Sequence, residues 1–122
     1  FLARAVIGSD QGRGGLVLAD RVRVGQTVRL QVRDADAADL DLKDALGRLP
    51  VSLGGGALLF SCRRRGAGLF GPSYGGVSHD PVVVREALGA DAVGGFFAAG
   101  ELGPVGGRSY LHGFTASVLL LP

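Results

Sequence analysis

The chain has 122 residues and a net charge of +2, with 47% hydrophobic and 20% charged residues. This length allows one domain with one core, and the composition is typical of a globular protein. No apolar run approaches the roughly 20 residues of a membrane-spanning helix, and the small charge with few aromatic residues argues against a nucleic-acid-binding protein. We therefore expect neither a membrane nor a nucleic acid among its partners.

The counts of cysteine, methionine and glycine further narrow the class of protein that this chain can be. Cys62 is the only cysteine, so no intrachain disulfide can form, which fits a cytoplasmic location. The first residues are not a secretory signal, and the chain has no methionine, so we expect a processed or excised piece of a cytoplasmic protein. The 22 glycines indicate tight turns and close approach of the backbone to another strand or to a ligand.

The first third of the chain has the patterns of strands. A short strand is expected over residues 3–8, and a second over residues 16–20. Val28, Leu30 and Val32 then alternate with polar residues. This period of two predicts a third strand with one buried face, of the kind found in antiparallel sheets.

A helix should follow this third strand. Asp34 or Asp36 can cap it, because an aspartate side chain accepts hydrogen bonds from the first free backbone N–H groups. Gly47 and Pro50 should end it. Its apolar stripe consists of Ala38, Leu42, Ala45, Leu46 and Leu49.

The second half of the chain contains one more helix and three more strands. Residues 54–62 form an almost unbroken apolar run and should be a central strand. A long loop rich in Gly and Ser comes next, and Asp80 as cap with Pro81 in the first turn should open a short helix that Gly89 closes. The last two strands, residues 92–101 and 110–121, are expected to form a hairpin.

These elements follow the order strand-strand-strand-helix-strand-helix-strand-strand. We therefore predict an α+β fold for a single domain over residues 1–122. It should have a mostly antiparallel sheet of five to six strands, with the two helices packed on one face.

Three polar residues, Cys62, Glu101 and His112, interrupt apolar strands or their ends. They could form a nucleophile system in which His112 is the base and Glu101 orients it. Alternatively, each has a structural role, since a free cysteine is usually a small buried hydrophobic residue. The spacing of Cys, His and carboxylate residues does not indicate a metal site.

The residues around Glu101 suggest a ligand contact. A carboxylate at a strand end can accept backbone N–H groups or a ligand amine, and if buried it needs a partner, for which Arg108, the arginines at 63–65, His112 or a ligand are available. The arginine run can hold a carboxylate or phosphate, or it can be a solvated start of a loop.

Three segments, "ALLFSCRRRGAGLFG", "VGGFFAAGELGPVGG" and "YLHGFTASVLL", are specific enough to compare with a known family. In this order they resemble the C-terminal half of the FIST domain, which is named from F-box and intracellular signal transduction proteins. The resemblance implies a sensory domain, here bacterial, that binds a small ligand such as an amino acid and passes its state to an output domain. By position, the motif residues are Asp34, Cys62, Arg65, Gly66, Gly100, Glu101, Gly103, Pro104, His112, Gly113 and Thr115.

The resemblance also implies partners. We expect a small-molecule ligand, an N-terminal FIST half-domain and a signalling output domain, with no cofactor, no metal and no catalytic residue. Glu101 would receive an amine, and Arg65 with Arg63 or Arg64 would hold a carboxylate. Arg63 and Arg64 stand where the family usually has small or polar residues, which could favour an anion. The alternatives are a cysteine-dependent hydrolase or transferase and a protein-interaction half-domain without a ligand.

Overall fold

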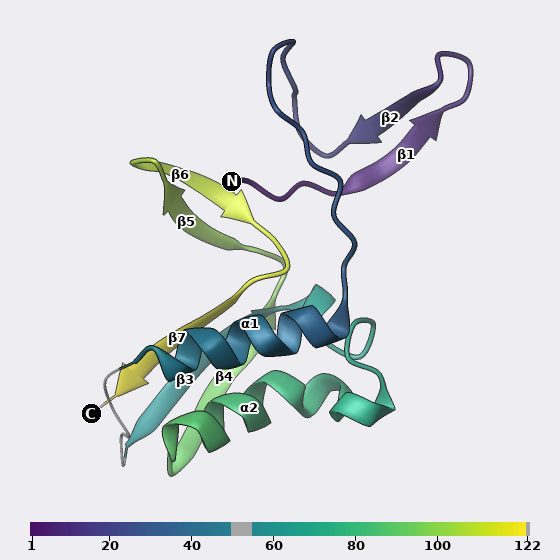
Figure 1. The fold of residues 1–122 in the computed structure, drawn as a ribbon. Coiled ribbons are helices and arrows are strands. Elements are labelled where there is room, and N and C mark those ends of the chain that lie inside the picture. The colour runs from purple at the N-terminus through teal and green to yellow at the C-terminus, as the bar shows by residue number, and fades with distance from the viewer. Residues whose placement is uncertain (50–54, 122) are drawn as a thin grey trace.

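A three-stranded sheet covered on one face by two helices forms the body of the protein (Figure 1). The structure is a computed structural model, and it describes residues 1–49 and 55–121. The central strand is β3 (Gly56–Cys62), which pairs in parallel with β4 (Ala92–Ala98) and antiparallel with β7 (Ala116–Leu121). The apolar run at residues 54–62 thus predicted the central position correctly.

The parallel pair arises from a strand-helix-strand unit. The chain leaves β3, passes through three short 3₁₀ helices (Arg63–Arg65, Pro72–Tyr74 and Gly76–Ser78), and returns through α2 (His79–Leu88) to β4. Parallel strands need such a crossover, and their sequences are near-continuous apolar runs, as these two are.

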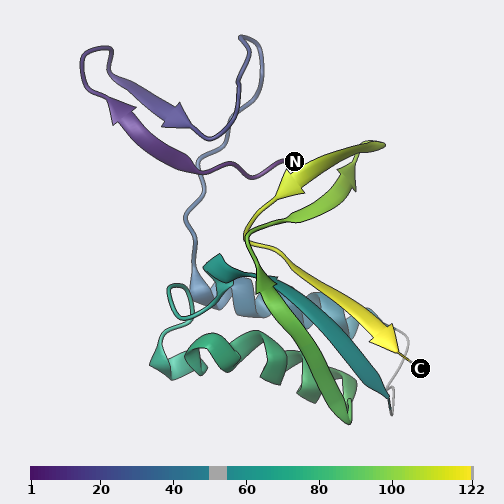
Figure 2. The same cartoon turned by 180° about the vertical axis from the view of Figure 1, so that it is seen from behind.

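Both helices lie on the same face of this sheet, as predicted (Figure 2). Helix α1 (Ala35–Gly47) begins after Asp34, whose side chain accepts a 2.9 Å hydrogen bond from the Ala37 N–H. The core between the layers consists of Leu42, Leu46, Ala57, Leu59, Val83, Val84, Leu88 and Ala90.

Two hairpins project from the body beyond the end of the sheet at which β3 ends (Figures 1 and 2). The first pairs β1 (Val6–Asp10) with β2 (Gly15–Leu18), and the second pairs β5 (Glu101–Val105) with β6 (Arg108–His112). A hydrogen bond of 3.2 Å from the Arg4 guanidinium to the Leu111 carbonyl connects the N-terminal segment to the second hairpin.

The prediction of one mostly antiparallel sheet of five to six strands is wrong, although the α+β class holds. The described residues form seven strands in three small sheets. The expected hairpin of residues 92–101 and 110–121 does not form, because β4 and β7 flank β3 on opposite sides. The last predicted strand is broken after His112, where Phe114 has a left-handed φ of 65°.

Three smaller expectations also change. Residues 28–32 lie in no strand of the described chain, and their apolar side chains are exposed. Helix α2 begins at His79, so Asp80 lies inside its first turn and makes side-chain bonds instead of a cap. Ala45 and Leu49 are exposed, unlike Leu42 and Leu46 of the same stripe. Pro50, the expected stop of the first helix, lies outside the described residues.

Across residues 1–49 and 55–121, no helix is both long enough and apolar enough to cross a membrane.

Candidate functional site

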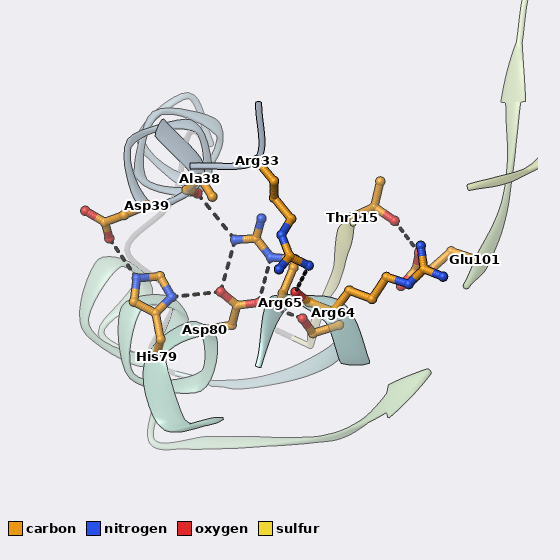
Figure 3. Close-up of polar contacts among 10 residues, drawn as sticks. Arg33, Ala38, Asp39, Arg64, Arg65, His79, Asp80, Glu101 and Thr115 are labelled. Atoms are coloured by element: carbon orange, nitrogen blue, oxygen red, sulfur yellow. Dashed lines mark hydrogen bonds and ion pairs between the residues drawn. The ribbon is translucent and has the colours of Figure 1, made fainter. Parts of the chain in front are cut away.

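Glu101 stands at the first position of β5, where the second hairpin leaves the sheet. One carboxylate oxygen, Oε2, accepts a hydrogen bond from the Thr115 hydroxyl (Figure 3). The other, Oε1, is buried and has no hydrogen-bond partner in the described part of the chain. A buried carboxylate oxygen without a donor is costly, because it has lost its water and gained nothing in exchange.

The loop between β6 and β7 forms one wall of this site. The Cys62 N–H donates a 2.9 Å hydrogen bond to the Thr115 carbonyl, which fixes the loop to the end of β3. Phe114 has a left-handed backbone conformation, which residues other than glycine rarely adopt. Its ring lies 5.1 Å from the guanidinium carbon of Arg64 and 5.7 Å from that of Arg33. Two cations therefore lie against one aromatic ring.

The predicted glycine and histidine residues hold the hairpin together. Nε2 of His112 lies 3.0 Å from the Gly103 carbonyl oxygen, and His112 is also paired in register with Glu101. A Cβ atom on Gly100 would lie 2.7 Å from the His112 carbonyl oxygen, too close for a side chain. Gly100 therefore permits a close approach of two backbone segments beside Glu101.

The three consecutive arginines have different environments. Arg63 and Arg64 are exposed, whereas Arg65 is only 6% exposed. In the view of Figure 3 the Arg64 side chain extends toward Glu101. The Arg33 guanidinium donates to the carbonyls of Arg64 and Gly68, each at 3.2 Å. Arg64 is thus the arginine of the run that is exposed and that lies against Phe114, next to Thr115 in the chain.

Arg65 forms a bidentate pair with Asp80 through Nε and one terminal nitrogen of its guanidinium group. Nε lies 2.9 Å from Oδ2 of Asp80, and a terminal nitrogen lies 3.0 Å from Oδ1. The Ser61 hydroxyl donates to the same carboxylate at 2.6 Å. Burial by itself raises the pKa of the Asp80 carboxyl, but the hydrogen bonds that it accepts outweigh burial and hold the pKa below the ordinary value of 3.8.

His79 extends this buried network to the first helix. Its ring nitrogens lie 2.9 Å from Asp80 and 2.9 Å from Asp39 (Figure 3). Its ring also stacks on Phe70. The hydrogen bond from Lys43 is the main cause that lowers the pKa of Asp39, and the one from His79 adds to it.

The sequence interpretation missed Asp39, His79, Asp80 and Ser61 as interacting residues. Two signals were present. Asp39 lies three and seven residues before Leu42 and Leu46, on the buried side of α1, and Ser61 follows Ala57 and Leu59 on the inward row of β3. A polar residue in an apolar row requires a buried partner.

The structure does not join the three residues of the possible nucleophile system. Cys62 is fully buried, and within residues 1–49 and 55–121 no hydrogen bond connects it to His112 or Glu101. In the same ranges, no group of three or more His, Cys, Asp or Glu side chains could hold a metal ion. A hollow of about 160 Å³ beside β4 is lined by Leu59, Ser61, Pro81, Val93 and Phe97, and by none of the predicted site residues.

The FIST C domain model matches residues 1–104. The chain belongs to the FIST C domain family. This domain is associated with signal transduction. The chain is 46% identical over 123 residues to the uncharacterized protein Rv0628c of Mycobacterium tuberculosis and 45% identical to the uncharacterized protein Mb0898c of Mycobacterium bovis. Each match covers 98% of this chain but only 31% of the relative, so the chain spans about a third of their length. No solved structure matches the chain.

The structure brings most of the motif residues that were predicted from the sequence to one place. Gly100, Glu101, Gly103, His112 and Thr115 meet where the second hairpin joins the sheet, and the Cys62 backbone contacts the same loop. Arg65 and Gly66 follow Cys62 in the first 3₁₀ turn. Asp34 lies apart from them, as the cap of α1.

Proposed function

We propose that this FIST C domain is a sensory domain that binds a small molecule bearing both an amine and a carboxylate, such as an amino acid. The observation that carries the proposal is the buried Oε1 atom of Glu101, which has no donor within the described residues. An ammonium group supplies three N–H donors and a positive charge, and it would satisfy this oxygen.

Arg64 is the candidate for the carboxylate of the ligand. It is exposed, it lies against Phe114, and a guanidinium binds a carboxylate through two parallel hydrogen bonds. Arg65, the residue expected from the family pattern, is already bonded to Asp80. The role of Arg65 would then be to position the turn that carries Arg64.

The place of the site supports a route by which the signal would be transferred. Glu101 begins β5, Cys62 ends β3 and Thr115 lies in the loop before β7, so a ligand between Glu101 and Arg64 would tighten the junction of the second hairpin with the sheet. The hairpin, in turn, would present the ligand state to an output domain of the same cytoplasmic protein. A ligand can shift such an equilibrium only by its difference in affinity for the two states.

A thermal-shift screen of the intact protein with amino acids and small carboxylates tests the proposal. The expected result is a rise in melting temperature that grows with ligand concentration and disappears in Glu101→Gln, because a ligand that binds the native state stabilises it by about 2.7 kcal/mol at 100 times its Kd. Glu86→Gln, on the exposed side of α2, is the matched control and should keep the shift. A screen without any shift, or a shift that survives in Glu101→Gln, contradicts the proposal.

A second comparison assigns the two ends of the ligand. Arg64→Ala should weaken binding of the amino acid but not of its amide, which lacks the carboxylate. Arg63→Ala, its exposed neighbour, should leave both unchanged. Equal losses for the acid and the amide would remove Arg64 from the ligand site.

A further inference from the structure

The chain exposes more surface than a folded chain of its size. Its accessible surface is 8728 Å² for a mass of 12.4 kDa. A folded monomer of this mass exposes about 6,100 Å². The excess of about 2,600 Å² is roughly three times the 800 Å² that each partner contributes to a standard interface, and it matches one partner's share of a large obligate interface.

Part of this surface is apolar and belongs to a segment with the pattern of a strand. Val28, Leu30 and Val32 are 61%, 78% and 91% exposed, and they alternate with Arg29 and Gln31. Residues 27–33 make no backbone hydrogen bond with the rest of the described chain. The segment therefore has the side-chain alternation of a strand without a neighbouring strand to pair with.

The end of this segment is fixed to the body. The Arg33 guanidinium binds two carbonyls of the turn after β3, and Asp34 caps α1. The segment thus leaves the domain at a defined point and in a defined direction, on the same side as both hairpins (Figure 1).

The two hairpins also expose apolar side chains that no other part of the described chain covers. Leu102 and Leu111 are opposite each other in the second hairpin, and they are 80% and 63% exposed. Ile7 of the first hairpin is 63% exposed. An isolated two-stranded hairpin is marginally stable in water, and exposed apolar surface costs about 25 cal/mol per Å², so these elements also require a covering layer.

We propose that residues 27–33 are a strand that adds to the edge of a sheet in the remainder of the parent polypeptide, whose apolar surface also covers Leu102 and Leu111. The lengths of the relatives indicate which chain covers this surface. They match this chain over almost its whole length and have more than two thirds of their own length outside the match. A partner in the same polypeptide also has a high effective concentration, so it occupies the surface without a separate encounter. The inference rests on exposed surface and strand pattern, and not on a ligand at Glu101.

Hydrogen exchange of the intact protein, followed by mass spectrometry, tests the strand. Nothing within the described chain protects the amides of residues 27–33, so slow exchange there has to come from outside it. We expect exchange at least about 100-fold slower than in an unstructured peptide, at all protein concentrations and in a monomer. Exchange at the unstructured rate overturns the proposal. Protection that falls on dilution, together with a dimer mass in light scattering, assigns the strand to a second copy and also overturns it.

A pair of substitutions on opposite sides of the segment gives an independent readout. Leu30→Asp places a charge in the proposed buried row and should lower the melting temperature of the intact protein by at least about 4 °C. Gln31→Asp places the same charge on the alternate row and should change it by less than about 1 °C. Equal shifts overturn the proposal. If Leu30→Asp cannot be produced, the exchange measurement on the unsubstituted protein still decides.

Discussion

Nε2 of His79 lies 2.9 Å from Oδ1 of Asp39, and this contact ties α2 to α1. Nδ1 of the same ring lies 2.9 Å from Asp80. The imidazole ring of His79 therefore bridges the carboxyl groups of Asp39 and Asp80. His79 thus forms a polar link between two helices that are otherwise joined by apolar packing.

The first prediction concerns Arg65 and its exposed neighbour. Arg65→Ala leaves Asp80 as a buried charge without its main partner and should lower the free energy of unfolding by about 3–5 kcal/mol. Arg63→Ala removes an exposed arginine and should change it by less than about 0.5 kcal/mol. Urea unfolding of both variants measures the difference. Similar effects in the two variants would show that the Arg65–Asp80 pair does not stabilise the fold.

The second prediction is a loss of stability in acid. The pKa values of Asp39 and Asp80 are lowered in the folded protein, so their protonation favours the unfolded state. Their stabilising contribution is complete above the unfolded aspartate pKa of about 3.9 and is lost as the pH falls through the lower folded values. Urea unfolding between pH 6 and pH 2 should therefore show a steep decrease below about pH 4.

Asp80→Asn is the variant that checks the cause. It should be less stable than the unsubstituted protein at neutral pH and should lose less stability on acidification, since one of the two groups no longer titrates. An unchanged slope below pH 4 would assign the acid sensitivity to other carboxylates.

The sequence predicted local elements well, because their determinants are local. The cap at Asp34, the stop at Gly89 and the unbroken apolar run of β3 each depend on neighbouring residues. Strand pairing depends on contacts between residues far apart, and here it was mispredicted. β4 pairs in parallel with β3 through a crossover that begins in a glycine-rich loop. Nothing in the sequence of either strand indicates whether the pair is parallel or antiparallel.

The alternation at residues 28–32 shows a different limit. The pattern encodes a strand, but a strand needs a neighbour, and none exists in the described chain. The candidate site shows the same contrast between local sequence patterns and contacts between distant residues. The proximity of Glu101, His112 and Thr115 agrees with the sequence pattern, and their role in a ligand site stays a prediction. The buried partner of Arg65 was missed, since Asp80 had an equally good local explanation as a helix cap.

The third prediction concerns Gly95 in β4. Its φ is 143°, and a Cβ atom there would overlap the Leu59 carbonyl oxygen of the paired strand. Gly95→Ala should therefore lower the free energy of unfolding by about 2–4 kcal/mol. Gly68→Ala is the control, because its added methyl group would meet no atom within 4 Å. Equal stabilities of the two variants would contradict the close approach of β4 to β3.

The last prediction separates the sensory proposal from a thiol-dependent activity. Cys62 is fully buried at the end of β3, and a thiol must be reached before it can act as a nucleophile. Alkylation by iodoacetamide at neutral pH should be at least about 100-fold slower in the native protein than in the urea-unfolded protein, because it requires local opening. Since Cys62 is the only cysteine, the modified mass reports this residue alone. Alkylation of the native protein as fast as that of a free thiol would contradict the burial and favour the cysteine-dependent alternative.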